Sequence, residues 1–140
     1  MPVQFFDEDA GFLPENQEML TEWVQKIAKE HGRKIDVLNY ILCSDEYLLE
    51  INQEYLQHED YTDIITFDHS EESSIIEGDV FISIERVKEN ASQLHQSFVD
   101  EFHRVLAHGL LHLLGFKDKT PDDQKVMTEK EDACLSLRHS

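Results

Sequence analysis

The sequence is poor in the residues that usually connect domains or cross-link a chain. Its 140 residues include three prolines and five glycines, and neither a Pro/Ser/Gly-rich linker nor an internal repeat indicates a second unit. The two cysteines, Cys43 and Cys134, are far apart and lack ligand spacing. This argues against a disulfide framework or a cysteine zinc site, and both thiols are expected to be small buried groups. We therefore expect one domain, residues 1–140, large enough to bury a core.

Long apolar runs and positive charge are also scarce. No stretch approaches the ~20 apolar residues that span a bilayer, and the N-terminus lacks the basic and apolar regions of a signal peptide. We expect a cytoplasmic protein that makes no contact with a membrane. Twelve Lys and Arg against 30 Asp and Glu give a net charge of −18. This charge disfavours sequence-independent binding to phosphate backbones, so any contact with nucleic acid would need a metal ion or a local basic cluster.

Hydrophobic periodicity predicts both helices and strands. Apolar residues at three- and four-residue steps predict a helix over about 16–31, ended by Gly32. Strands are predicted at 3–6, 34–43, 62–67 and 78–83, and further helices at about 44–55, 86–95, 97–114 and 121–137. The strand–helix–strand start favours a parallel pair with the first helix as crossover. The expected fold is α+β, with a small mixed four-stranded sheet packed by about five helices.

The longest predicted helix carries two histidines one turn apart. His108 and His112 share a helical face, because a helix has 3.6 residues per turn. After Gly115 ends the helix, the chain can turn back and bring Asp118 as a third ligand. Three protein ligands with an open fourth position are typical of a catalytic zinc site. Such a pair can instead be two partly buried histidines with carboxylate or backbone partners, but the apolar sequence around them favours a metal that serves both.

The residue after His108 distinguishes this motif from that of the zinc proteases. In His-Glu-x-x-His the glutamate is the general base, but position 109 of this chain is glycine. The motif therefore offers ligands without a built-in base, which argues against peptide hydrolysis. Glycine at this position would also let a substrate or another backbone approach the helix closely.

The segment from His108 to Asp118 resembles the signature of the YbeY family of metal-dependent endoribonucleases, His-Gly-x-Leu-His-Leu-x-Gly-Tyr-Asp-His. Further matches span roughly residues 34–135: Asn52, Tyr55, the segments 62–67 and 78–83, Met127 and Glu131. The resemblance implies a single-strand-preferring endoribonuclease that acts in 16S ribosomal RNA processing and small-subunit maturation. Its implied partners are a ribosomal RNA precursor, a basic small-subunit ribosomal protein and a ribosome-assembly GTPase.

Two positions depart from the family pattern. The third histidine of the signature is replaced by Asp118, and the residue before it is Lys117. An aspartate binds zinc at about the same distance as a histidine, but its charge makes the centre less positive. Two histidines with one carboxylate also suit iron(II), so we expect one divalent ion, Zn²⁺ first, with Fe²⁺ or Ni²⁺ as alternatives. Leu56 stands where the family commonly has an arginine that is linked to the phosphate, which bears on the strength of RNA cleavage.

Other candidate site residues have simpler interpretations as well. In the resemblance, Thr62 and Asp63 line the cleft beside the metal, with Asp63 as a further catalytic candidate, although both types also suit a turn. Asp79 is a candidate acceptor for a ligating imidazole, or the residue that ends the loop before a strand. The candidate RNA-binding residues are Thr62, Arg104, Lys117 and Lys119. The remaining histidines are not expected to be ligands: His103 points elsewhere, and His31, His69, His95 and His139 are expected to be solvated.

Two other functions remain open. An open metal site does not specify phosphodiesters, so the chain could be a metal-dependent hydrolase of another substrate. It could also be a ribosome-assembly factor without catalysis, whose metal is structural. The absence of a built-in base and the presence of Leu56 favour this last interpretation.

Overall fold

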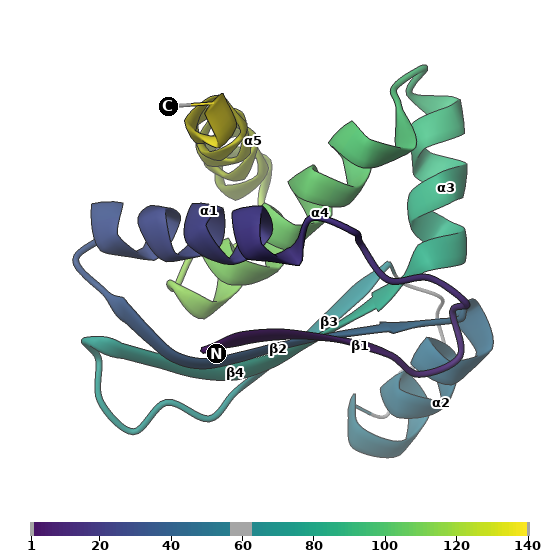
Figure 1. The fold of residues 1–140 in the computed structure, drawn as a ribbon, viewed down its shortest axis with the longest axis horizontal. Helices are drawn as coiled ribbons and strands as arrows, with labels where there is room; N and C mark the ends of the chain where they lie inside the picture. The colour runs from purple at the N-terminus through teal and green to yellow at the C-terminus, as the bar shows by residue number, and fades with distance from the viewer. Residues whose placement is uncertain (1, 57–62, 140) are drawn as a thin grey trace.

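The computed structural model describes residues 2–56 and 63–139 (Figure 1). The predicted α+β fold is confirmed, with one four-stranded sheet and five α-helices in this part of the chain. In chain order the elements are β1 (Val3–Asp7), α1 (Gln17–Glu30), β2 (Lys34–Cys43), α2 (Asp45–Leu56), β3 (Ile64–Asp68), β4 (Ile75–Ser83), α3 (Ile84–Gln93), α4 (Phe98–Leu113) and α5 (Pro121–Ser136), followed by a 3-10 turn at Leu137–His139.

The sheet is mixed, as predicted, and has the strand order β1-β2-β4-β3. β1 and β4 are both parallel to β2, whereas β3 is antiparallel to β4. The prediction of a parallel β1–β2 pair with α1 as its crossover is therefore confirmed. β4 begins at Ile75, three residues before the predicted strand, because its pairing with β2 already starts at Lys34 and Ile75.

The two faces of the sheet are covered unequally. Helices α1, α3, α4 and α5 lie on one side, and α2 lies alone on the other (Figure 1). The larger core lies beneath α1 and α4 and includes Leu20, Val24, Ile27, Leu38, Tyr40, Leu106 and Leu110. A smaller cluster, Cys43, Leu48, Ile51 and Ile65, lies beneath α2. Both cysteines are buried free thiols, as expected.

Helix α4 approaches the sheet closely because glycines lie at the contact. A Cβ on Gly109 would be 2.7 Å from Cγ1 of Val80, and one on Gly78 would be 2.9 Å from Cδ1 of Leu113. The hydroxyl of Tyr40 donates a hydrogen bond to the carbonyl of Leu106 at 2.9 Å, which ties the helix to the middle of the sheet. These contacts fix the helix that carries the predicted histidines.

None of the helices in the described part of the chain combines the length and the apolar composition that crossing a bilayer requires.

Candidate metal centre

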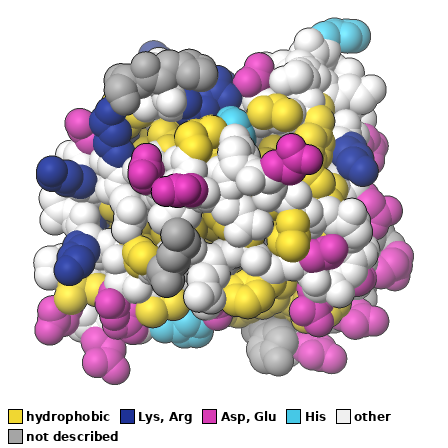
Figure 2. All heavy atoms as spheres, in the orientation of Figure 1, with side chains coloured by type: hydrophobic (Ala, Val, Ile, Leu, Met, Phe, Trp, Pro, Cys, Tyr) yellow, Lys and Arg dark blue, Asp and Glu magenta, His cyan; other side chains and the backbone are white. Residues whose placement is uncertain are grey.

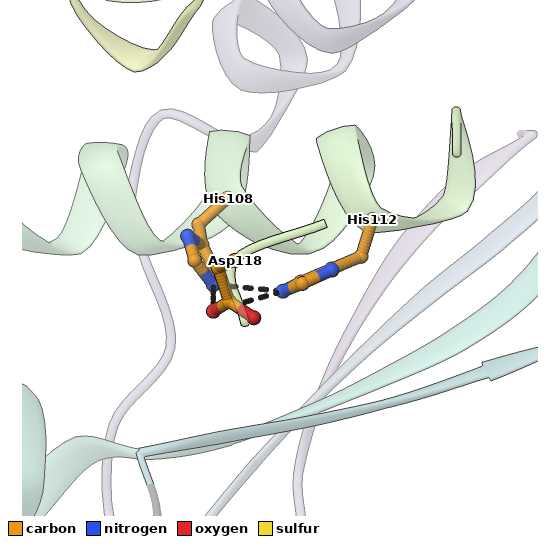
Figure 3. A group of neighbouring side chains, drawn as sticks. All are labelled: His108, His112 and Asp118. Atoms are coloured by element: carbon orange, nitrogen blue, oxygen red, sulfur yellow. Dashed lines mark hydrogen bonds and ion pairs between the residues drawn. The ribbon is translucent and has the colours of Figure 1, made fainter. Parts of the chain in front are cut away.

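His108 and His112 project from the same side of α4 (Figure 3). Their Nε2 atoms are 3.0 Å apart, and the two rings meet edge to face with centroids 4.5 Å apart. Both side chains are partly buried, with 19% and 24% of their surface exposed. The helical spacing thus brings two nitrogen lone pairs to one point at the edge of the protein.

Asp118 reaches this point from the loop that follows α4. Gly115 has a φ of +105°, which glycine adopts without the strain of a side chain. The turn is closed by hydrogen bonds from Gly115 N to the carbonyl of His112 and from Phe116 N to that of Leu111, both at 3.0 Å. Oδ2 of Asp118 then lies 3.4 Å from Nε2 of His108 and 3.5 Å from Nε2 of His112 (Figure 3).

The far side of each imidazole is held by an acceptor. Nδ1 of His108 donates to Oε2 of Glu131 at 2.6 Å, and Nδ1 of His112 donates to the carbonyl of Phe116 at 3.1 Å. Glu131 is buried on α5, and its other oxygen accepts from Nη1 of Arg104 at 2.9 Å. Since both Nδ1 atoms donate, the Nε2 atom of each neutral ring carries a bare lone pair.

This donor set fits a metal ion. Two imidazole lone pairs and a carboxylate oxygen converge within 3.0–3.5 Å, and three acceptors without a donor repel one another unless a cation lies between them. Ligand atoms about 2.0–2.1 Å from a tetrahedral zinc ion are about 3.3 Å from each other. One ligand atom from each of the three residues lies within 4.8 Å of the other two, close enough for all three to bind a single ion.

The titration of the two rings reflects this surrounding charge. Burial acts to lower the pKa of His108, but the hydrogen bond to Glu131 and the charges of Glu131, Asp63 and Asp118 outweigh it and raise the pKa. Burial, together with the neighbouring His108, lowers the pKa of His112 despite the attraction of Asp118. The neighbouring carboxylates thus favour positive charge at His108, whereas burial and the nearby His108 disfavour it at His112.

The structure places the remaining predicted site residues around this cluster in different ways. Asp63 accepts a hydrogen bond from Nδ2 of Asn90 at 3.5 Å, and its charge contributes to the raised pKa of His108. Arg104 is occupied by two carboxylates, those of Glu131 and Asp132. Lys117 and Lys119 are exposed on either side of Asp118. Thr62 and the side chain of Leu56 lie outside the described residues.

Asp79 is not an acceptor for a ligating imidazole, nor does it end a loop. It lies inside β4, accepts from Nδ2 of Asn39 at 3.0 Å and pairs with Nε2 of His69 at 3.2 Å. The prediction placed the strand start too late, because β4 extends back to Ile75.

Two further expectations need correction. Gly109 faces Val80 and Ile64 of the sheet, so the close approach that it allows is between α4 and the sheet and not to a substrate. His31 is only partly solvated: its Nδ1 lies 2.9 Å from the carbonyl of Ile27, and its ring meets that of Phe116 edge to face. His95 is exposed, and His103 points away from the metal ligands and pairs with Arg138, as expected.

The contact between Glu131 and His108 was not predicted, although Glu131 is one of the positions that match the family. A signal was available, since Met127, Glu131 and Cys134 recur at helical steps along the buried face of α5. A carboxylate within an apolar stripe needs a partner with an N–H group or a charge. Glu101 has the same signature on α4, where it is buried, and burial raises its pKa although Arg104 opposes this.

Comparisons with known proteins agree with the resemblance found in the motif. Residues 5–138 match the family model described as Endoribonuclease YbeY. A relative of that name from Cytophaga hutchinsonii is 55% identical over 136 residues, which cover 97% of this chain and 95% of the relative. Another from Flavobacterium johnsoniae is 42% identical over 134 residues, with 96% of each chain covered.

A solved structure shares the fold. The solution structure of a Thermotoga maritima protein aligns with a TM-score of 0.66 and 26% identity, covering 97% of this chain and 88% of the other. Family model, relatives and fold thus agree over nearly the whole length. The chain belongs to the YbeY family.

Proposed function

We propose that this chain is a metal-dependent endoribonuclease that cuts single-stranded RNA, with a divalent ion, Zn²⁺ in first place, held by His108, His112 and Asp118. The observation that carries the proposal is the convergence of their three ligand atoms within 3.0–3.5 Å, while both Nδ1 atoms donate elsewhere. The relatives named as endoribonucleases supply the substrate class.

The proposed site residues have different roles in the reaction. When bound, zinc supplies Lewis-acid polarisation of a phosphoryl oxygen and an activated water near neutral pH. Glu131 holds the proton of His108 on Nδ1 and thereby keeps Nε2 available as a ligand. Asp63 lies close enough to act on the charge of His108, which makes it our candidate for accepting a proton at the open side of the site.

The biological substrate that fits the family is a ribosomal RNA precursor. We propose that the enzyme acts in the cytoplasm in 16S ribosomal RNA processing, where a basic small-subunit ribosomal protein and a ribosome-assembly GTPase are its proposed partners. The net charge of −18 favours a basic protein partner. Lys117 and Lys119, exposed beside the metal ligands, are the proposed phosphate contacts near the scissile bond. Thr62 and Arg104 remain proposed contacts as well, although Arg104 would first have to leave its carboxylates.

The test couples metal content to cleavage. Treatment with a chelator should abolish cleavage of a single-stranded RNA, and stoichiometric Zn²⁺ should restore it. The His108→Ala/His112→Ala variant should hold no metal by elemental analysis and should not cleave. Cleavage that persists in the metal-free double variant would overturn the proposal.

The same assay separates the other two functions. Turnover of peptide or small-ester substrates without turnover of RNA would indicate another hydrolase. Tight stoichiometric zinc, no RNA turnover and co-sedimentation with small-subunit precursors would indicate an assembly factor with a structural metal.

A further inference from the structure

Positive charge is concentrated in one short segment of this acidic chain. Residues 26–34 contain four of the 12 Lys and Arg residues and only one of the 30 Asp and Glu residues. Figure 2 shows most of the visible Lys and Arg side chains on the side of the molecule where α1 ends and α5 lies, whereas the opposite side is mainly acidic. The distribution of charge is therefore far from uniform.

Part of this segment lines a cavity of about 510 Å³, which we call the basic pocket. Its lining includes Lys29, Arg33 and Lys34, with Gln25 as a further donor and Asp36 as the only carboxylate. Lys29 and Lys34 are exposed, and neither forms an ion pair with the described acidic side chains. Two exposed ammonium groups thus line the hollow, and neither is paired with the one carboxylate of its lining.

Arg33 is unusual among the four arginines, all of which lie in the described part of the chain. Arg86, Arg104 and Arg138 each pair with carboxylates. Arg33 pairs with none there, and its Nη atoms donate to the carbonyls of Leu113 and Ile75 at 3.4 and 3.2 Å. Its charge is held in place without being neutralised, and the guanidinium has five N–H donors in all.

The basic pocket is linked to the metal centre through the end of α4. Arg33 contacts Leu113, the residue directly after His112. The ring of His31 packs on Phe116, whose carbonyl orients His112. The ammonium group of Lys130 also lies over the ring of Phe116, 5.4 Å from its centroid. Basic side chains therefore contact both the end of α4 and the turn that leads to Asp118.

We propose that the basic pocket, through Lys29, Arg33 and Lys34, binds a backbone phosphate of the RNA outside the cleavage site. The inference rests on the proposed function and adds a second anchoring point for the same substrate. Charges beyond about 8 Å are screened at physiological salt, so the local basic group governs this contact although the net charge is −18. The pocket also supplies cations in a chain that has Leu56 where its family commonly has an arginine.

The test compares two variants that lose the same charge. Lys29→Gln/Lys34→Gln removes the exposed cations of the basic pocket, and Lys88→Gln/Lys125→Gln removes two exposed lysines from α3 and α5. Binding of zinc-loaded protein to a labelled single strand of about 20 nucleotides is followed by fluorescence anisotropy between about 50 and 200 mM salt, before measurable cleavage. Zinc content and thermal melting curves establish that all variants are folded and loaded.

For the pocket variant, the slope of log K against log salt should become shallower by about 0.7, since the pocket is proposed to hold one phosphate and each phosphate contact on a single strand contributes about 0.7. Its KM for the long RNA should rise while kcat stays unchanged. An RNA too short to extend from the metal centre to the basic pocket should be cleaved as by wild type. The control variant should follow wild type in every measurement.

An unchanged salt slope and KM in the pocket variant, with normal RNA cleavage by wild type, would overturn the proposed role of the pocket but leave the proposed function intact. If the pocket variant bound RNA as wild type does but lost binding to free phosphate or to an acidic peptide, the pocket would have a different ligand. That outcome would also overturn the proposal. Wild-type protein that neither binds nor cleaves RNA would overturn both.

Discussion

The two halves of the metal centre are held in different ways. The histidines come from α4, are about one-fifth to one-quarter exposed, and have their far nitrogens fixed by Glu131 and Phe116. Asp118 comes from the loop after the helix and is 43% exposed, and in the described structure its carboxylate contacts only the two imidazoles. The imidazoles are therefore held by hydrogen bonds on their far sides, whereas the carboxylate is held only by its contacts with the imidazoles in the described part of the chain.

Removal of a helix ligand should have the largest effect. Zinc binding worth roughly 10–16 kcal/mol over four ligands corresponds to about 3 kcal/mol for each, so His112→Ala should weaken zinc binding more than about 100-fold. A titration against a chromophoric chelator measures this. His95→Asn is the matched control, because His95 is exposed and Asn tolerates its positive φ. Zinc affinity in His112→Ala within a few-fold of wild type would contradict the assignment of this ligand.

Removal of the loop ligand should cost less. Water can replace the exposed carboxylate, so Asp118→Ala should retain about tenfold more zinc affinity than His112→Ala, a difference of about 1.4 kcal/mol. Asp118→His should keep zinc but bind Mn²⁺ and Fe²⁺ relatively less well, because imidazole suits zinc and a carboxylate suits the harder ions. Competition between metals gives both results. Equal losses for the helix and loop variants would remove the distinction between the two halves.

The helix half could be predicted from the sequence because it depends on local periodicity. The spacing of His108 and His112 follows from 3.6 residues per turn, and Gly115 ends the helix as expected. The strand–helix–strand start likewise implied the observed parallel pair. In each case neighbouring residues determine the outcome.

Contacts between distant segments could not be predicted in this way. Glu131 lies 23 residues after His108 and reaches it because α4 and α5 pack together. The role of Asp79 was misjudged because the start of β4 depends on pairing with β2, 40 residues earlier in the chain. Gly109 was predicted to admit a substrate or another backbone, and the packing of α4 on the sheet decides between the two. Tertiary contacts, which periodicity does not encode, determine all three.

Loss of the hydrogen-bond partner of His108 should lower zinc affinity less than loss of a ligand. Glu131→Gln removes the charge that orients and polarises the ring, and zinc affinity should fall by about tenfold, at the low end of the range for such partners. Asp132→Asn is a matched control, because Asp132 pairs with the same Arg104 but does not touch the histidine. The same chelator titration serves for both. A loss of similar size in the two variants would assign the effect to Arg104 and not to the orientation of His108.

The smallest effect should come from a change at the contact between α4 and the sheet, and it should appear in the free energy of unfolding. Alanine favours a helix over glycine by up to about 1 kcal/mol, but the new Cβ in Gly109→Ala would lie 2.7 Å from a methyl of the stiff, buried Val80. Overpacking costs about 1–3 kcal/mol, so the variant should lose about 1 kcal/mol of unfolding free energy, a fall of a few degrees in Tm. Val80→Ala/Gly109→Ala should then be more stable than the sum of the two single changes predicts, by at least about 0.5 kcal/mol. Strict additivity in denaturant titrations would contradict the contact and, with it, the view that the sheet sets the position of the two histidines.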